Sequence, residues 1–296
     1  NVKTFKVLCG YLGELPNLIE VKDGDTLDLG HHKLKFVFTP WVHWPETMMS
    51  YDMTDGILFS GDAFGSFGAI DGGAFDDQVV FDDRLESEMR RYYSNIVGKY
   101  SNMVQKAFAK LSTLDIRAIC PLHGLVWRND PAKVIELYRR WCHYEAEEGV
   151  VVIYGSMYGN TAQMADYIAY KMAEAGVKQI RVHDASKTHL SYLINDIWRY
   201  KGVILGSCAY NTMMLPTMDA LLHIGAKNRY LGLFGTYSWN GGGVRTLKQF
   251  AEEIGWEQVA EPAEIMGRLT SEKIAVCDAL AASMAAKVLG DSTSDC

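Results

Sequence analysis

Three polar side chains in the first half of the chain directly follow strand-like segments. Imidazole and carboxylate groups on loops at strand ends suit zinc or iron, and a carboxylate can bridge two such ions. Each of these side chains alone is more often a capping or packing residue, but all three stand in the same relation to a strand. The sequence therefore predicts a metal site at one edge of a sheet. The three residues are His43, Asp62 and His123, which follow residues 33–39, 57–60 and 116–120.

The stretch from Val150 to Thr161 has the pattern of a strand, a tight polar loop and the start of a helix. In this arrangement the backbone N–H groups, the hydroxyls and the positive end of the helix dipole bind an anion. The loop has no Lys or Arg and lacks the Gly-Lys-Ser/Thr pattern of triphosphate sites. It therefore predicts a phosphate monoester held by hydrogen bonds. The alternative is an ordinary βα turn that is rich in Gly and Ser.

Two later loops, Ser207–Pro216 and Gly235–Gly243, follow further strand-like runs. Each joins small residues, which expose the backbone, to an aromatic residue, as needed to hold and flank a flat ring. In a doubly wound sheet these loops meet at the carboxyl ends of the strands, where a flavin binds in the flavodoxin order. An aromatic residue beside Gly can equally be a packed loop lid. Together the three loops predict a flavin. The absence of a Gly-x-Gly-x-x-Gly turn favours FMN over FAD.

These loops lie at the same sheet edge only if strands and helices alternate along the chain. In the second half of the sequence, strand-like and helix-like runs do alternate. Five βα units predict a doubly wound parallel sheet. In its first helix Met164, Ile168 and Met172 fall four apart, a spacing typical of a buried helix face. The strand-like runs are 150–154, 179–183, 202–206, 230–234 and 264–266, and the helix-like runs are 162–175, 190–199, 216–224, 244–254 and 272–289.

The first half reads as a β meander followed by helices. We expect two short strands within Leu18–Gly30 and a hairpin about the Asp55-Gly56 turn. Residues 85–111 are expected to be mostly helical, and residues 132–148 to form the closing helix of this half. The sequence thus predicts an α/β protein with two domains, residues 1–148 and residues 149–296.

Composition narrows the class of protein. A length of 296 residues suits about two domains, and a net charge of −7 argues against a nucleic-acid surface. No apolar run is long enough for a membrane span, and no signal peptide is visible, although the chain begins at Asn1. The six cysteines include no Cys-x-x-Cys pair, which excludes a zinc ribbon, a rubredoxin-type iron site and a thioredoxin motif. Scattered cysteines fit a cytoplasmic protein.

Three motifs in the first half resemble a known family. The segments His43-Trp-Pro-Glu-Thr-Met48, Gly61-Asp-Ala-Phe-Gly65 and Pro121-Leu-His-Gly124 look like the later ligand segments of a metallo-β-lactamase-fold domain. Followed by a flavodoxin-like domain, they resemble the flavodiiron proteins, also called A-type flavoproteins. The resemblance implies a partial αββα metallo-β-lactamase-like domain and a flavodoxin-like domain with a five-stranded parallel sheet. It also implies that His43, Asp62 and His123 are iron ligands, with Asp62 bridging two ions.

The same resemblance assigns the flavin residues. The first loop would hold the FMN phosphate, and the two later loops would approach the ring from opposite sides. The phosphate residues are Ser156, Met157, Tyr158, Gly159, Asn160 and Thr161; the second loop supplies Ser207, Ala209, Tyr210 and Asn211, and the third supplies Thr236, Tyr237, Trp239, Asn240 and Gly241.

The chain departs from the family at its start. The family's first ligand run, His-x-Glu-x-Asp-His, precedes the His-Trp-Pro segment, but the 42 residues before His43 contain no such run. A similar run, His143-Tyr-Glu-Ala-Glu-Glu148, falls in the expected closing helix and is interpreted as a solvated helix face. We expect a fragment whose opening part is absent or lies on another chain. The alternative is a degenerate domain that never bound two irons.

The leading functional hypothesis is a flavodiiron oxidoreductase, in which electrons from a protein donor pass through FMN to two irons. Dioxygen would be reduced to water or nitric oxide to nitrous oxide. The resemblance implies a rubredoxin or reduced deazaflavin as donor and at least a head-to-tail homodimer. One alternative is an FMN electron carrier with an inactive metal domain, and another is a metallo-hydrolase, since the lactamase fold usually binds zinc.

Overall fold

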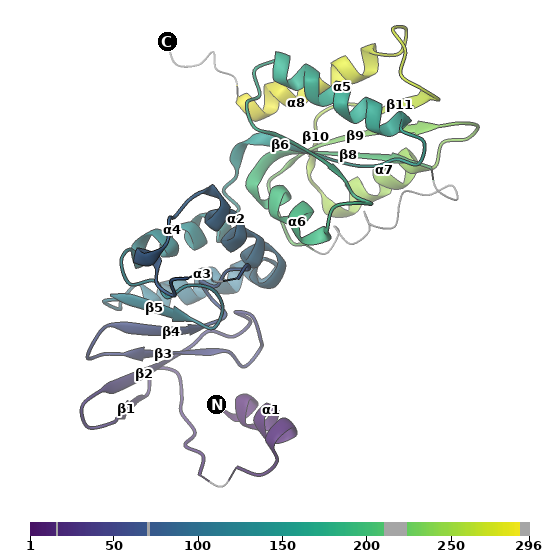
Figure 1. Ribbon diagram of the computed structural model, residues 1–296. Helices are drawn as coiled ribbons and strands as arrows, with labels where there is room; N and C mark the ends of the chain where they lie inside the picture. The colour runs from purple at the N-terminus through teal and green to yellow at the C-terminus, as the bar shows by residue number, and fades with distance from the viewer. Residues whose placement is uncertain (16, 70–71, 210–223, 291–296) are drawn as a thin grey trace. The chain divides into compact units, whose positions relative to one another are not determined.

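The chain folds into two compact units, residues Asn1–Glu145 and Ala146–Cys296. A computed structural model describes residues 1–15, 17–69, 72–209 and 224–290 (Figure 1). Each unit carries its own sheet and its own core, so each is described by itself. Within the described residues no helix has the length and apolar character needed to cross a membrane.

The sheet of the first unit has five strands in chain order. Antiparallel pairing joins β1 to β2, β2 to β3 and β3 to β4, whereas β5 pairs with β4 in parallel. The carboxyl ends of β2, β4 and β5 therefore lie at the same edge of the sheet. The strands are β1 (Thr26–Asp28), β2 (Lys33–Phe38), β3 (Met48–Asp52), β4 (Ile57–Gly61) and β5 (Ala118–Pro121).

Helices α2, α3 and α4 lie together beside β5 (Figure 1). Asp82 begins α2 (Asp83–Tyr92) by accepting a hydrogen bond from the Leu85 N–H, and Asp130 begins α4 (Pro131–Cys142) in the same way. Between α2 and α3 (Ser101–Leu111) the chain forms one π-helical segment, Tyr93–Val97. Short 3₁₀ turns occupy Asp76–Gln78 and Gly98–Tyr100.

The core of the first unit lies between these helices and the sheet. Leu58 and Ile119 of the sheet are fully buried, as are Met89, Tyr93 and Tyr138 of the helices. Full burial of such a side chain contributes roughly 1.5–3 kcal/mol. Ring contacts continue through this core, with Tyr138 5.0 Å from Tyr93 between centroids.

Three sequence expectations for the first unit are wrong in detail. Residues 18–20 form no strand, so the expected strand pair within Leu18–Gly30 is reduced to β1. The closing helix ends at Cys142 instead of residue 148, because Tyr144 takes a left-handed backbone conformation (φ 61°) that a helix does not tolerate. The run from His143 to Glu148 is therefore no helix face, and its last residues belong to the next strand.

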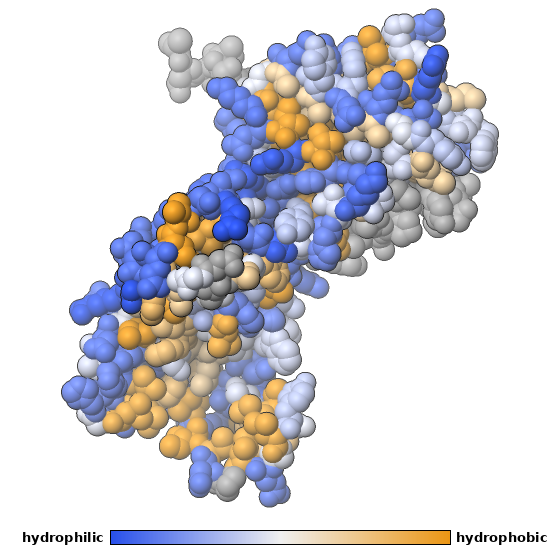
Figure 2. All heavy atoms as spheres, in the orientation of Figure 1, coloured by the Kyte–Doolittle hydropathy of each residue, from blue (hydrophilic) through white to orange (hydrophobic). Residues whose placement is uncertain are grey.

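Helix α1 (Val2–Leu12) was not foreseen. Asn1 caps it by accepting from the N–H groups of Lys3 and Thr4, and its side chain also donates to the Glu46 carbonyl at 3.1 Å. No residue of α1 is buried, and several of its apolar side chains are exposed, including Phe5 and Leu12. Figure 2 shows this apolar surface beside β1 and β2.

The second unit is a parallel sheet in the flavodoxin order. Strand β6 (Glu147–Gly155) lies between β7 (Ile180–Asp184) and β8 (Tyr200–Cys208), and β9 (Tyr230–Tyr237) follows β8. Two short segments share the fifth position. β10 (Glu257–Gln258) pairs with the start of β9, and β11 (Ala263–Met266) pairs with its end. The predicted five-position, doubly wound sheet is therefore confirmed, with its last strand interrupted.

Helices cover both faces of this sheet. Figure 1 shows α5 and α8 on one side and α6 and α7 on the other. Met164, Ile168 and Met172 are fully buried against α8, as their spacing predicted. The expected helix at residues 216–224 lies almost entirely outside the described residues. The helices are α5 (Asn160–Glu174), α6 (Leu190–Arg199), α7 (Gly243–Ile254) and α8 (Ala275–Leu289).

Candidate metal and flavin sites

The structure brings His43, Asp62 and His123 together. His43 Nε2 lies 3.5 Å from Asp62 Oδ2, and His123 Nε2 lies 3.3 Å from Asp62 Oδ1. Each carboxylate oxygen thus faces a different imidazole. The Asp62 side chain is 21% exposed and His123 is 54% exposed, so the group opens to the surface.

Sheet topology explains this convergence. Asp62 and His123 follow β4 and β5, which run in parallel and end opposite one another at Gly61 and Pro121. The N–H of Leu122 donates to the Gly61 carbonyl at 2.8 Å and ties the two strand ends together. His43 belongs to the connection that leaves β2 at the same edge, where the Trp41 N–H donates to the Trp44 carbonyl.

These residues fit the expected iron ligands. A carboxylate whose two oxygens face different imidazoles has the arrangement of a bridge between two ions, each with one histidine. The imidazoles offer nitrogen and Asp62 offers charged oxygen, a donor set that iron accepts.

The loop that carries His123 is fixed from both ends. Ile119 and Trp127 exchange backbone hydrogen bonds of 2.8 and 2.9 Å, which makes the intervening residues a closed loop. Beyond it, Asp76 accepts hydrogen bonds from the backbone N–H groups of Arg128, Asn129 and Asp130. Burial opposes ionisation of Asp76, but these three donors outweigh it and lower the pKa of that carboxyl.

Tyr92 was not anticipated from the sequence. Its hydroxyl donates to Asp62 Oδ1 across a long 3.5 Å, and its ring lies 5.6 Å from that of His123. Burial, followed by the charge of Asp62, raises the pKa of Tyr92, so the hydroxyl keeps its proton. Tyr92 ends α2, the π-helical segment starts at Tyr93, and both tyrosines are buried. No sequence pattern marks such a segment.

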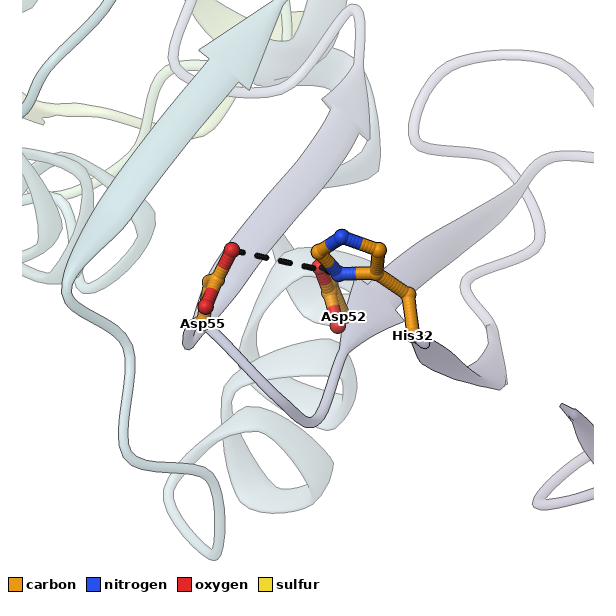
Figure 3. Close-up of side chains that lie close together, drawn as sticks. All are labelled: His32, Asp52 and Asp55. Carbon is orange, nitrogen blue, oxygen red and sulfur yellow. Dashed lines mark hydrogen bonds and ion pairs between the residues drawn. The ribbon is translucent and has the colours of Figure 1, made fainter. Parts of the chain in front are cut away.

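A second cluster lies at the opposite edge of the same sheet (Figure 3). His32 Nδ1 is 2.8 Å from Asp52 Oδ2 and 3.8 Å from Asp55 Oδ2. Asp52 also accepts from the Thr54 N–H, and this bond together with His32 lowers the pKa of the Asp52 carboxyl. Both oxygens of Asp52 are therefore engaged in holding a turn, which accounts for the cluster without a metal.

The second unit contains a cavity of about 420 Å³ at the carboxyl ends of its strands. All three predicted loops contribute to it. Met157, Tyr158 and Trp239 are largely exposed at its rim, so broad side chains flank the opening. The lining residues are Ser156, Met157, Tyr158, Asn160, Thr161, Cys208, Ala209, Thr236, Tyr237, Ser238, Trp239 and Asn240.

The phosphate loop has the expected conformation of a helix start. Gly159 adopts φ +86° directly before α5, a left-handed backbone that Gly adopts without strain. Its N–H donates to the Ser156 hydroxyl at 3.1 Å, which makes the loop tight. The first N–H groups of α5 carry the positive end of the helix dipole, as a phosphate site requires.

The other two loops are held by close backbone contact. A Cβ on Gly235 would lie 2.6 Å from the Ser207 carbonyl oxygen, and one on Gly243 would lie 3.0 Å from the carbonyl of Cys208. Only glycine therefore allows the ends of β8 and β9 to approach this closely. These contacts hold both ends of the third loop against the end of β8.

The remaining predicted flavin residues have different positions. Ser207 is fully buried, and its hydroxyl donates to the Cys208 carbonyl, so it supports the loop from behind. Gly241 lies against Glu264, whose carboxylate would meet a Cβ at 2.8 Å. Tyr210 and Asn211 lie outside the described residues. Cys208 and Ser238 line the cavity but were not singled out, although their place at strand ends is the signal that identifies them.

Comparison with known proteins agrees with both units. The family model for the ODP family β-lactamases matches residues 3–124, and the flavodoxin model matches residues 152–287. The anaerobic nitric oxide reductase flavorubredoxins of Escherichia coli and Shigella dysenteriae are 34% identical over 249 residues. That alignment covers 81% of this chain and 52% of each relative, so the chain spans about half the length of these curated relatives.

Solved structures share the fold. The rubredoxin oxygen:oxidoreductase of Desulfovibrio gigas is 26% identical, with a TM-score of 0.89 over 96% of this chain and 72% of its own. A variant of the flavo di-iron protein of Thermotoga maritima is 27% identical, with a TM-score of 0.84 over 96% of this chain and 71% of its own. The flavodiiron protein of Giardia intestinalis, 24% identical with a TM-score of 0.90, supports the fold alone.

The two units therefore define an α/β protein that joins a lactamase-like domain to a flavodoxin domain. Its relatives and structural neighbours are flavorubredoxins and flavodiiron proteins, as the resemblance in three short motifs predicted.

Proposed function

We propose that this chain is part of a flavodiiron oxidoreductase that passes electrons from a protein donor through FMN to a di-iron site. There dioxygen is reduced to water, nitric oxide to nitrous oxide, or both. The observation that carries the proposal is the pairing, in one chain, of a carboxylate shared by two imidazoles with a flavin-type cavity bordered by three loops. We assign the iron role to residues 1–148 and the FMN role to residues 149–296.

In the first unit the proposed ligands are His43, Asp62 and His123. Neutral imidazole nitrogens and an ionised Asp62 would hold the cations, and the Tyr92 hydroxyl would donate a hydrogen bond toward Asp62 Oδ1. Because burial raises the pKa of Tyr92, this hydroxyl remains a proton donor over the physiological pH range. Asp76 and the Ile119–Trp127 pairing would keep His123 in place.

In the second unit Ser156 to Thr161 would bind the FMN phosphate through backbone N–H groups and hydroxyls. Tyr158, Tyr237 and Trp239 would flank the ring, and the backbone of the Gly235 and Gly243 loops would close around it. The bound flavin supplies one-electron transfer, and bound iron supplies reduction of the diatomic substrate.

Partners follow from the relatives. The curated relatives are named flavorubredoxins, and one structural relative is named a rubredoxin oxygen:oxidoreductase. We therefore propose a rubredoxin-type donor, with a reduced deazaflavin as the alternative. A head-to-tail homodimer would let the flavin of one subunit serve the irons of its partner.

One observation favours a second candidate, an FMN electron carrier. Among the residues that the structure describes, Asp62 has only two candidate ligands beside it, His43 and His123, whereas a stable iron pair uses several donors per ion. Such a carrier would accept electrons from the donor and pass them on without consuming nitric oxide.

The test begins with the purified protein. Cofactor released by heat should be FMN, one per chain, and FAD as the main species would contradict the proposal. The protein is then reconstituted anaerobically with ferrous iron and supplied with a reduced rubredoxin. Consumption of nitric oxide or dioxygen that depends on iron supports the oxidoreductase, whereas donor oxidation with added ferricyanide but no gas consumption supports the carrier.

A further inference from the structure

Two threonines from distant parts of the second unit share a buried hydrogen bond. Thr161, the second residue of α5, places its Oγ1 2.8 Å from Oγ1 of Thr236, near the end of β9. Thr161 is fully buried and Thr236 is 7% exposed, yet both belong to the lining of the cavity. This bond joins the proposed phosphate loop to the start of the loop that would flank the ring.

The number of protons on the two hydroxyls determines what each can offer a ligand, depending on which threonine donates the shared hydrogen bond. A hydroxyl has one proton and two acceptor lone pairs, so a bond between two hydroxyls uses one of two protons. Among the hydrogen bonds of the described residues, neither hydroxyl has another acceptor. If Thr236 donates, the Thr161 proton is free for a ligand. If Thr161 donates, it can present only lone pairs to the phosphate side.

We propose that Thr236 is a positioning residue that makes the site selective for the phosphate ester of the flavin. The inference rests on the proposed FMN site. A phosphate beside Thr161 accepts its proton, and Thr161 must then accept from Thr236. Each bond strengthens the other, because a donor that is itself accepting a hydrogen bond is polarised. Thr236 therefore contributes to phosphate recognition from the opposite loop.

This role gives Thr236 an effect that a residue packed against the ring would lack. Riboflavin has the same ring and side chain as FMN but no phosphate. It therefore does not determine which of the two threonines donates the hydrogen bond to the other. Replacement of Thr236 by Val keeps the shape and removes the donor. We expect FMN affinity to fall about two- to tenfold, the range for one hydrogen bond, and riboflavin affinity to change less than about twofold. Thr236→Ser keeps the donor and should bind FMN like the parent.

The experiment measures dissociation constants of FMN and riboflavin for the apoprotein by fluorescence titration. The set comprises the parent, T236V, T236S, T161V and the double variant T161V/T236V. T161V should lose more FMN affinity than T236V, and the double variant should lose no more than T161V, since the two hydroxyls act through one chain of bonds. Thermal unfolding of each apoprotein controls for loss of fold, and T236A replaces T236V if the latter does not fold.

Equal weakening of FMN and riboflavin by T236V, or additive losses in the double variant, would overturn the inference. An unchanged FMN affinity in T236V would overturn it as well. A parent protein that binds neither flavin contradicts the FMN site itself, so failure of the proposed function is distinguishable from failure of this inference.

Discussion

The two candidate sites lie at the carboxyl ends of strands, but they are built from different parts of the chain. In the first unit three side chains from three separate connections come together, and two imidazoles lie 3.3 and 3.5 Å from the one carboxylate. In the second unit three loops line the cavity, and glycines next to it allow backbone segments to pack so closely that an added Cβ would lie 2.6 to 3.0 Å from a neighbouring carbonyl.

This difference predicts different tolerance to substitution. A metal site depends on the identity of a few donor atoms, so removal of one donor has a large effect. A site lined by backbone N–H groups distributes binding over many weak contacts, so loss of one side chain has a small effect. In such a site the substitutions with large effects are those at glycines, where any added side chain would push the loops apart.

The largest effect is expected at Asp62. Asp62→Asn removes the charged oxygen that both ions would share, so iron affinity should fall by more than the 10- to 100-fold typical of losing a hydrogen-bond partner of a ligand. His43→Ala and His123→Ala should each lose less. Iron per chain after anaerobic reconstitution measures this, with FMN content expected to remain unchanged.

Asp55→Asn is the matched control, because Asp55 is an exposed carboxylate at the opposite edge of the same sheet. It should retain parental iron. If Asp62→Asn binds as much iron per chain as the parent, Asp62 is only a turn residue and the first unit has no metal site that depends on it.

The next effect is expected at Gly235. Gly235→Ala places a Cβ 2.6 Å from the Ser207 carbonyl oxygen and 2.6 Å from Val244, so the ends of β8 and β9 must separate. Overpacking of this kind costs about 1–3 kcal/mol, and we expect FMN affinity to fall roughly 10- to 100-fold. Ser238→Ala, in the same loop, should change it less than about threefold. Similar affinities in the two variants would contradict a backbone-built site.

A smaller effect is expected at Asp76, which holds the loop that follows His123. Its folded pKa is lowered by backbone donors, so its stabilising contribution is present at neutral pH and is lost as the pH falls through the folded pKa. Asp76→Asn should lower the free energy of unfolding by about 1–2 kcal/mol at pH 7. The difference from the parent should shrink below about pH 4.

Urea unfolding followed by tryptophan fluorescence at pH 7 and pH 3.5 measures this difference, because Trp127 is buried next to the loop. Asp77→Asn is the control, since its carboxylate pairs only with the exposed side chain of Arg128 among the described contacts. A loss in Asp76→Asn that is the same at both pH values would contradict the charge argument.

The smallest effect is expected for single side chains of the flavin loops. Ser156→Ala removes the acceptor of the Gly159 N–H, but the helix N-terminus and the other loop N–H groups remain. FMN affinity should fall only about two- to fivefold, within the worth of one hydrogen bond. We expect the same of Asn211→Ala. If Ser156→Ala shows no FMN binding in a fluorescence titration, side chains and not backbone N–H groups supply most of the binding energy.

The fold and the site could be predicted from the sequence where the local pattern of residues and their chemistry indicate the same structure. The convergence of His43, Asp62 and His123 follows from three residues that share a position after strands, and the βα repeat predicted the doubly wound parallel sheet of the second unit. Contacts made across long sequence distances were not predictable. Tyr92 reaches Asp62 across 30 residues, and Asp76 reaches Arg128 across 52 residues.

Other errors have local causes. The segment that starts at residue 18 carries the apolar Leu18, Ile19 and Val21, but no strand among the described residues pairs with residues 18–20, and a strand without a partner does not form. The expected closing helix runs to residue 148, whereas Glu147 is the first residue of β6 and its carboxylate accepts a hydrogen bond from Arg199. Tertiary partners decided both cases.

The parallel pairing of β4 with β5 bears on how the first unit folds. Strands β2, β3 and β4 pair through short hairpins, but 56 residues separate Gly61 from Ala118, and all of α2 and α3 must be placed before β5 can join. Closing such a long loop is entropically costly, and contacts of this range form slowly. His123 reaches Asp62 only at that step. If these residues bind iron as proposed, refolding experiments should find that metal affinity develops with the slowest phase, and iron would select chains that have completed their topology.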